Sequence, residues 1–321
     1  MRIELLNQSK YRHGSRPGDD VPLIVPGVVF GVFDGATDAL STEIDGISAG
    51  RLAALTVAAE LAAFATEPDA RRLPAREIID HLSRALCRRT DPLGLVIPPS
   101  TTVAAVLDCG AEWRFLLIGD TGIRINGETV LRHEKKIDEV STEARVRIFQ
   151  ALSPRLKTGD ATERAARRTI MLGLDTAIAE EVFSAAEMNT LIEDVIATTQ
   201  LAPHSATVER FLRGGIRTQF TFGNATGPLG FDTMNGTTVP LEQLIDEYRP
   251  KSQVMSLEIF TDGYPAMPQD VTPDAWEAAF QEAERIDFHK TSNYRSVKGS
   301  TEMEFFDDRT VLILSDMLDV R

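Results

Sequence analysis

The chain has 321 residues, of which 43% are hydrophobic and 26% charged, a composition typical of a globular protein with a sizeable core. Its net charge of −14 argues against a nucleic-acid partner, because phosphate backbones are bound by clustered lysine and arginine. The only cysteines, Cys87 and Cys109, exclude a disulfide scaffold and a zinc finger. No apolar run reaches the ~18 residues of a membrane span, and the N-terminus lacks the apolar core of a signal peptide. We therefore expect a cytoplasmic protein without a membrane partner.

The first third of the chain predicts strands followed by two helices. Residues 1–6 and 27–33 are expected to be strands, with a polar loop over 7–22 between them. Residues 48–66 and 75–89 have apolar side chains at helical spacing, so each is expected to form a helix with one buried face. A hairpin should follow, because strand-like runs at 101–108 and 114–118 are separated by five residues that include a glycine.

The middle of the chain differs in character from both ends. Residues 136–200 are rich in Ala, Glu and Arg and have helical periodicity throughout. Strands resume at 256–261 and 310–316. Strands at both ends with helices between them favour an α+β layered architecture over alternating βαβ units. We expect one domain over residues 1–321, in which the helix-rich segment is an insert or a lid.

Aspartates stand at the boundaries of several expected strands. Asp34 and Asp262 each follow an apolar strand and precede a glycine, and Asp307 comes just before the last strand. A tight turn explains any one of them, since Asp-Gly suits turns. Carboxylates at neighbouring strand ends would converge, however, and would repel one another unless cations lay among them. Oxygen ligands without His or Cys favour Mg²⁺ or Mn²⁺, and two such ions can hold a phosphoryl group for attack.

Six motifs in order along the chain resemble those of the metal-dependent protein serine/threonine phosphatases of the PPM type, also called type 2C. They are "PGDDV" (17–21), "VFGVFDGATD" (29–38), "STTVAAVLD" (100–108), "LLIGDTGIRI" (116–125), "LEIFTDGYP" (257–265) and "DDRTVLIL" (307–314). The resemblance implies a four-layer α-β-β-α sandwich of two antiparallel sheets flanked by helices, with the metal site at one end. The six motifs extend over residues 17–314, so the resemblance covers nearly the whole chain.

The resemblance also implies a set of site residues. Asp34 would bridge two Mn²⁺ or Mg²⁺ ions, and Asp19 would orient a metal-bound water in place of the family's Glu. Asp34 and Asp262 would be catalytic as well as metal-binding, with Arg16 as the phosphate-binding group. The metal ligands would be Asp20, Asp34, the carbonyl of Gly35, Asp262 and Asp307.

Three positions depart from the family's pattern. The phosphate-binding arginine of the family falls on Ser15 here, so that Arg16 or Arg12 would have to replace it. The family's His after the first Asp-Gly is Ala36, which removes an acid for the leaving group. An acidic ligand for a third ion, beside Asp120, is replaced by Ala266.

The resemblance implies an enzyme that hydrolyses phosphoserine or phosphothreonine in a phosphoprotein by attack of metal-bound hydroxide. A phosphatase of small phosphate esters is an open alternative. A second alternative is a pseudophosphatase that keeps the fold as a binding or regulatory module. The missing His and displaced Arg favour the pseudophosphatase, whereas the retained Asp34, Asp262 and Asp307 favour the enzyme. The sequence identifies neither the substrate nor the oligomeric state.

Overall fold

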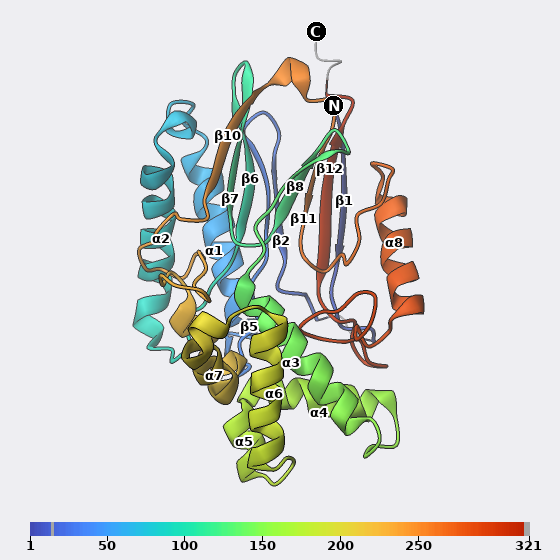
Figure 1. Ribbon diagram of the computed structural model, residues 1–321. Coiled ribbons are helices and arrows are strands. Elements are labelled where there is room, and N and C mark those ends of the chain that lie inside the picture. Colours follow the sequence, from blue (N-terminus) through green and yellow to red (C-terminus); the bar gives the residue numbers. More distant parts are fainter. Residues whose placement is uncertain (14–15, 318–321) are drawn as a thin grey trace.

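Two five-stranded antiparallel sheets pack face to face in the computed structural model, which describes residues 1–13 and 16–317 (Figure 1). One sheet has the order β1-β12-β11-β8-β9, namely Arg2–Gln8, Arg309–Ser315, Leu257–Phe260, Gly122–Ile125 and Thr129–Leu131. The other has the order β10-β7-β6-β3-β2, namely Ile245–Pro250, Glu112–Ile118, Val103–Cys109, Val29–Phe33 and Val21–Val25. A small hairpin joins β4 and β5 (Glu43–Ile44 and Ile47–Ser48).

The central strands of the second sheet, β3, β6 and β7, are buried on both faces. In β3, Phe30 and Val32 pack against the other sheet, whereas Val29 and Phe33 pack against helices. Successive side chains of a strand point to opposite faces, so an uninterrupted apolar run is what a central strand of this sandwich needs. The run at 28–33 is therefore apolar throughout because both faces of β3 are buried, one against the other sheet and one against helices.

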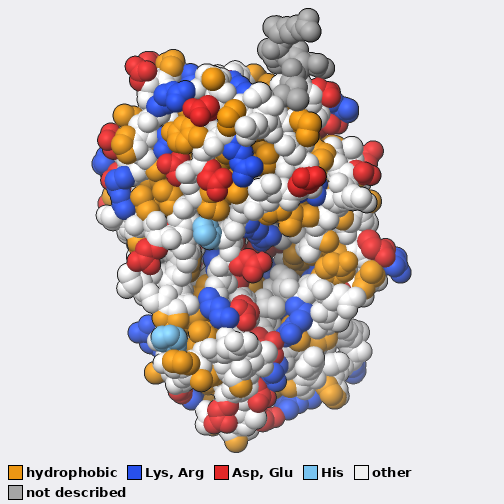
Figure 2. All heavy atoms as spheres, turned by 45° about the horizontal axis from the view of Figure 1, so that its top comes forward, with side chains coloured by type: hydrophobic (Ala, Val, Ile, Leu, Met, Phe, Trp, Pro, Cys, Tyr) orange, Lys and Arg blue, Asp and Glu red, His pale blue; other side chains and the backbone are white. Residues whose placement is uncertain are grey.

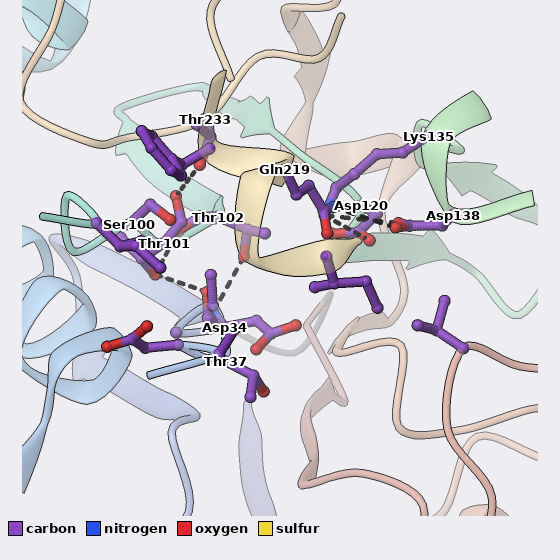
Figure 3. Close-up of a pocket in the computed structure, with 18 of the residues that line it drawn as sticks. Asp34, Thr37, Ser100, Thr101, Thr102, Asp120, Lys135, Asp138, Gln219 and Thr233 are labelled. Atoms are coloured by element: carbon purple, nitrogen blue, oxygen red, sulfur yellow. Dashed lines mark hydrogen bonds and ion pairs between the residues drawn. The ribbon is translucent and has the colours of Figure 1, made fainter. Parts of the chain in front are cut away.

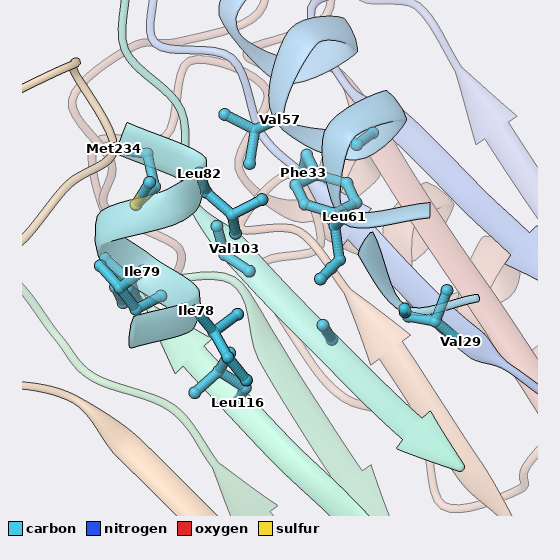
Figure 4. Packing of buried hydrophobic residues seen from close by; sticks show 14 of the residues in the cluster. Val29, Phe33, Val57, Leu61, Ile78, Ile79, Leu82, Val103, Leu116 and Met234 are labelled. Atoms are coloured by element: carbon cyan, nitrogen blue, oxygen red, sulfur yellow. The ribbon is translucent and has the colours of Figure 1, made fainter. Parts of the chain in front are cut away.

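Helices cover the outer face of each sheet. Helices α1 (Ala49–Phe64) and α2 (Ala75–Thr90) pack on the second sheet, where Leu61, Ile78 and Leu82 are fully buried (Figure 4). Helix α8 (Pro273–Ile286) packs on the first sheet through Trp276 and Phe280. The predicted α-β-β-α sandwich is confirmed.

The helix-rich segment forms a separate hydrophobic cluster at one end of the sandwich (Figure 1). It extends past residue 200, because a further helix and a 3₁₀ segment pack on the same cluster. Its elements are α3 (Lys136–Leu152), α4 (Gly159–Leu172), α5 (Leu174–Ala179), α6 (Ala185–Thr198), α7 (Ser205–Gly214) and η4 (Ile216–Phe222). Shorter 3₁₀ turns are η1 (Ala70–Arg72), η2 (Asp91–Leu93), η3 (Ala202–His204) and η5 (Lys251–Gln253).

Several elements were not predicted from the sequence. Helix α8 carries clear signals, because the Thr272 side chain accepts a hydrogen bond from Ala275 N at 3.2 Å and Pro273 occupies the first turn. Strands β9 and β10 lie at sheet edges and have exposed residues, so they lack a strong apolar pattern. The expected loop over 7–22 is shorter than predicted, since β1 ends at Gln8 and β2 begins at Val21.

The surface mixes charges of both signs. On the face in Figure 2, acidic, basic and hydrophobic side chains are interspersed, without a broad basic area. Within residues 1–13 and 16–317, every helix falls short of the length and apolar character that crossing a membrane requires.

Candidate functional site

Six aspartates line one pocket of about 170 Å³, and four of them stand at the ends of strands. Asp34 directly follows β3, Asp120 lies between β7 and β8, Asp262 follows β11, and Asp307 precedes β12. Strands of both sheets thus end at the pocket. The antiparallel pairing places these strand ends side by side, as their positions in the sequence suggested.

The backbone of Asp34 is held by the two threonines that directly precede strand β6. Thr102 N donates to Asp34 O at 2.9 Å, and Asp34 N donates to Thr102 Oγ1 at 3.0 Å. The Thr101 hydroxyl donates to Asp34 O at 2.8 Å (Figure 3). Gly35 is required next to it, because a Cβ there would lie 2.4 Å from the carbonyl carbon of Gly50. This framework fixes the backbone and leaves the Asp34 carboxylate free to face the pocket.

Asp34 and Asp262 differ from the other pocket carboxylates. Among the described residues, neither side chain has a hydrogen-bond or ion-pair partner. Burial and then the charges of Asp20 and Asp262 raise the pKa of Asp34 well above its usual range. Burial and then the charges of Asp307 and Asp120 raise the pKa of Asp262 to about 7. Both carboxyl groups therefore resist ionisation in the metal-free protein, because no protein cation balances the charge that they would carry.

Lysines neutralise the other two strand-end carboxylates. Lys298 Nζ lies 2.9 and 3.1 Å from the two carboxylate oxygens of Asp307, and Lys135 Nζ lies 2.9 Å from Asp120 Oδ2. Figure 3 shows Lys135 reaching Asp120 beside Asp138. Burial alone would raise the pKa of Asp307, but Lys298 and Lys10 outweigh it and the pKa is lowered. The second oxygen of Asp120, Oδ1, is buried and has no hydrogen-bond partner among the described residues.

Asp20 lies behind the pocket rather than in its wall. It is 2% exposed, and its Oδ2 accepts hydrogen bonds of 2.8 Å from the hydroxyls of Thr261 and Thr310. Burial and then the charge of Asp308 raise its pKa well above the usual range. The structure thus brings Asp20 close to the strands that carry Asp262 and Asp307, although it does not line the cavity.

Asp19 joins a different ion-pair group. Lys10 Nζ lies 3.5 Å from Asp19 and 3.4 Å from Asp308, and Asp19 N donates to Asp308 Oδ2 at 2.9 Å. The Ser48 hydroxyl also donates to the Asp19 carboxylate. The Asp19 carboxylate therefore already has Lys10 and Ser48 as partners.

The structure does not bring Arg16 or Arg12 into the pocket. The Arg16 guanidinium pairs with Glu43 on the surface, and Arg12 donates to Glu284 Oε2 at 2.8 Å while lying over the ring of Phe305. Ser15 lies outside the described residues. The positive groups that do line the pocket are Lys135 and Lys298, which sequence reasoning missed because neither belongs to a recognisable motif.

Part of the pocket lining is an apolar wall. It comes from the loop before β6 and from the helical segment, and its residues are Ile97, Pro98, Pro99, Met171, Ile216 and Phe220. A ligand that fills the pocket would therefore contact both carboxylates and hydrocarbon.

The pocket offers few protein oxygen atoms to a metal ion, and a hard divalent cation that keeps several waters suits such a site. Across residues 1–13 and 16–317, no group of three or more His, Cys, Asp or Glu side chains has an arrangement that could hold a metal ion. Mg²⁺ usually keeps several waters and is bound through only one or two carboxylates. Asp34 and Asp262, both without a protein partner, meet that requirement, whereas Asp307 is occupied by Lys298.

Comparison with known proteins returns structures but no close sequence relatives. No family model and no curated protein matches the chain. The serine/threonine phosphatase Stp1 from Staphylococcus aureus aligns with a TM-score of 0.47 at 11% identity, covering 98% of this chain and 94% of that chain.

Two further matches are phosphatases named PstP. The serine/threonine phosphatase PstP/Ppp of Mycobacterium tuberculosis gives a TM-score of 0.42 at 13% identity and covers 97% of both chains. The PstP catalytic domain in complex with two manganese ions gives a TM-score of 0.44 at 12% identity, covering 97% of this chain and 96% of that chain. All three are serine/threonine phosphatases, the class that the sequence motifs resemble, but similarity this distant assigns no activity to the chain.

Proposed function

We propose that this chain is a metal-dependent phosphatase that hydrolyses phosphoserine or phosphothreonine in a phosphoprotein. The observation that carries the proposal is the convergence of Asp34, Asp120, Asp262 and Asp307 in one pocket, two of them without a balancing cation. A protein gains nothing in stability from buried, unbalanced carboxylates, because each costs desolvation energy and repels the others. Their presence supports a site that is completed by a cation.

The residues of the pocket have separate roles in this proposal. Asp34 and Asp262 would hold the divalent cation from two sides, with the Gly35 carbonyl as a further oxygen donor. When bound, the cation would neutralise charge on the phosphate and lower the pKa of a coordinated water. The apolar wall around Ile216 and Phe220 would contact the part of the substrate next to the phosphate.

The proposal is tested by measuring phosphate-ester hydrolysis by the protein with added metal ions and after treatment with a chelator. We expect hydrolysis of p-nitrophenyl phosphate and of a phosphothreonine peptide with Mn²⁺ or Mg²⁺, and none after chelation. The matched control is Asp45→Asn, because Asp45 also precedes a glycine but lies in the β4–β5 turn outside the pocket. Asp45→Asn should keep full activity. Absence of turnover by the wild type under all metal conditions would contradict the proposal.

The same assay addresses the small-molecule alternative. Efficient hydrolysis of the aryl phosphate with no hydrolysis of phosphopeptides would favour an enzyme for small phosphate esters. A phosphoprotein enzyme should instead show a lower KM for phosphopeptides, because the apolar wall can contact residues on either side of the phosphate.

A binding module without catalysis is the second candidate. It is favoured by the pairing of Lys298 with Asp307 and Lys135 with Asp120, and by the position of Arg16 outside the pocket. Such a protein would bind a phosphopeptide without hydrolysing it. Stabilisation by the peptide in a melting experiment, with no phosphate release over hours, would support this candidate over the enzyme.

A further inference from the structure

Lys298 has a defined position in the pocket. Its ammonium group contacts both carboxylate oxygens of Asp307 and lies 3.1 Å from Thr37 Oγ1, and its side chain is only 16% exposed. With both oxygens of Asp307 accepting from one ammonium group, that carboxylate is already neutralised. A divalent ion could use Asp307 only by displacing Lys298.

Buried groups of the helical segment hold the Lys298 loop in place. Gly299 N donates to Glu163 Oε1 at 2.7 Å, and Arg167 donates to Gly299 O at 2.7 Å. Arg145, which is fully buried and paired with Glu163, donates from Nε to Ser296 O at 2.9 Å. The residues on both sides of Lys298 are thus tied to α3 and α4, so moving the ammonium group out of the pocket would disturb a buried network.

The rest of the pocket is unevenly charged. Six carboxylates and two lysine ammonium groups line the pocket. Asp38 accepts hydrogen bonds from Leu40 N and Thr42 N, and Asp138 accepts one from Gln219 and lies 3.9 Å from Lys135. Because Asp120 and Asp307 pair with the lysines, Asp34 and Asp262 are the pocket carboxylates without a partner among the described residues. The orphaned and buried Oδ1 of Asp120, which lines the same cavity, is an independent sign that a donor or cation belongs there.

We infer that this pocket binds a single divalent cation between Asp34 and Asp262, and that Lys298 replaces a second ion at Asp307. The inference rests on the metal-dependent function proposed above. It reduces the number of bound ions from the two that the family resemblance implies to one. Lys298 is a positioning residue in this account: it fixes Asp307 and balances its charge. Mg²⁺ and Mn²⁺ suit a site with two carboxylates because they retain coordinated waters.

Counting bound Mn²⁺ tests the inference without measuring activity. The metal-free full chain is titrated with Mn²⁺ by calorimetry, and the stoichiometry is checked by native mass spectrometry and electron paramagnetic resonance. We expect one Mn²⁺ per wild-type chain and an uncoupled spectrum. Lys298→Met should bind two ions with a spin-coupled spectrum, because ions about 4 Å apart share ligands. Lys157→Met, a change at an exposed lysine outside the pocket, should still bind one.

A second variant keeps the test decisive if Lys298→Met does not fold. Asp307→Asn in the wild-type background should change the Mn²⁺ affinity less than about 3-fold, whereas Asp262→Asn should weaken it at least about 10-fold. Two ions on the wild type, one ion on folded Lys298→Met, or equal losses in Asp307→Asn and Asp262→Asn would each overturn the inference. Two ions on the wild type would leave the proposed phosphatase function standing, whereas no bound ion would overturn both.

Discussion

Arg145 and Glu163 are fully buried and balance each other's charge, whereas the half-buried Asp34 and Asp262 have no balancing partner among the described residues. Arg145 and Glu163 are both fully buried, pair with each other, and donate to or accept from backbone groups of residues 296–299. Asp34 and Asp262 carry like charge and have no partner among the described residues. Buried charge is matched by the protein where it holds segments together, and left unmatched where a ligand is expected to supply the opposite charge.

Breaking the matched pair should have the largest effect on stability. Glu163→Gln leaves Arg145 buried without a counter-charge, and loss of one partner of a buried pair typically costs about 3–5 kcal/mol of unfolding free energy. Urea unfolding at neutral pH measures this loss. Glu180→Gln is the control, because the pair of Glu180 with Arg168 lies at the exposed surface, and it should leave the midpoint nearly unchanged. A stable Glu163→Gln protein would show that the network is dispensable.

Removing a charge from the unmatched pair should affect function instead. Asp262→Asn should lower Mn²⁺-dependent turnover at least about 100-fold. Mutating a residue that only hydrogen-bonds to a metal ligand typically costs about 10–100-fold, and loss of a direct ligand should cost more. Asn is nearly isosteric, so the fold should survive. Mn²⁺ should raise the melting temperature of the wild type by mass action, and this shift should shrink or vanish in the variant. Full turnover by Asp262→Asn would refute the assignment of Asp262 as a ligand.

The pH dependence of the metal-free protein sharpens the same contrast. The pKa of Asp262 is about 7 in the folded protein and about 3.9 in an unfolded chain. Between these values the folded state keeps a proton that the unfolded chain has released, so the unfolding free energy falls as pH rises from about 4 to 7. Asp34 acts in the same direction.

We therefore expect metal-free Asp262→Asn to be more stable than the wild type at pH 8, by about 1–3 kcal/mol. The two proteins should converge below about pH 3, where Asp262 is protonated in both states. Asp307 has a lowered pKa and contributes the opposite slope, which is confined to acid pH. Denaturant unfolding at several pH values in chelator measures the difference. A wild type that gains stability relative to the variant as pH rises would contradict the account.

Arg16 should give the smallest effect. Its guanidinium pairs with Glu43 at the exposed surface and lies outside the pocket, and exposed pairs contribute little energy. Arg16→Ala should therefore change KM for a phosphopeptide less than about 2-fold. Steady-state kinetics measures this value. A large rise in KM would instead support the phosphate-binding role that the sequence suggested for Arg16.

Much of the architecture was predictable from local pattern. The central strands, helices α1 and α2 and the β6–β7 hairpin follow from apolar periodicity and turn spacing. The convergence of Asp34, Asp262 and Asp307 on one pocket could be anticipated because each stands at a strand end. Edge strands such as β10 carry a weaker signal, since their exposed residues need not be apolar.

The lysines of the pocket could not be predicted in the same way. Lys298 lies nine residues before Asp307 in an irregular loop, and its position depends on contacts with Arg145, Glu163 and Arg167 from distant helices. Such contacts arise from tertiary packing, so no regular spacing of residues in the sequence indicates them. The same holds for Arg16, whose proximity to the acidic motif in sequence does not bring it into the pocket.

Locating Mn²⁺ by anomalous X-ray scattering from crystals grown with the ion tests the central claim most directly. The account predicts one anomalous peak, between the carboxylates of Asp34 and Asp262, with Lys298 still on Asp307. A peak coordinated by Asp307 with Lys298 displaced, or no peak in the pocket at saturating Mn²⁺, would contradict it.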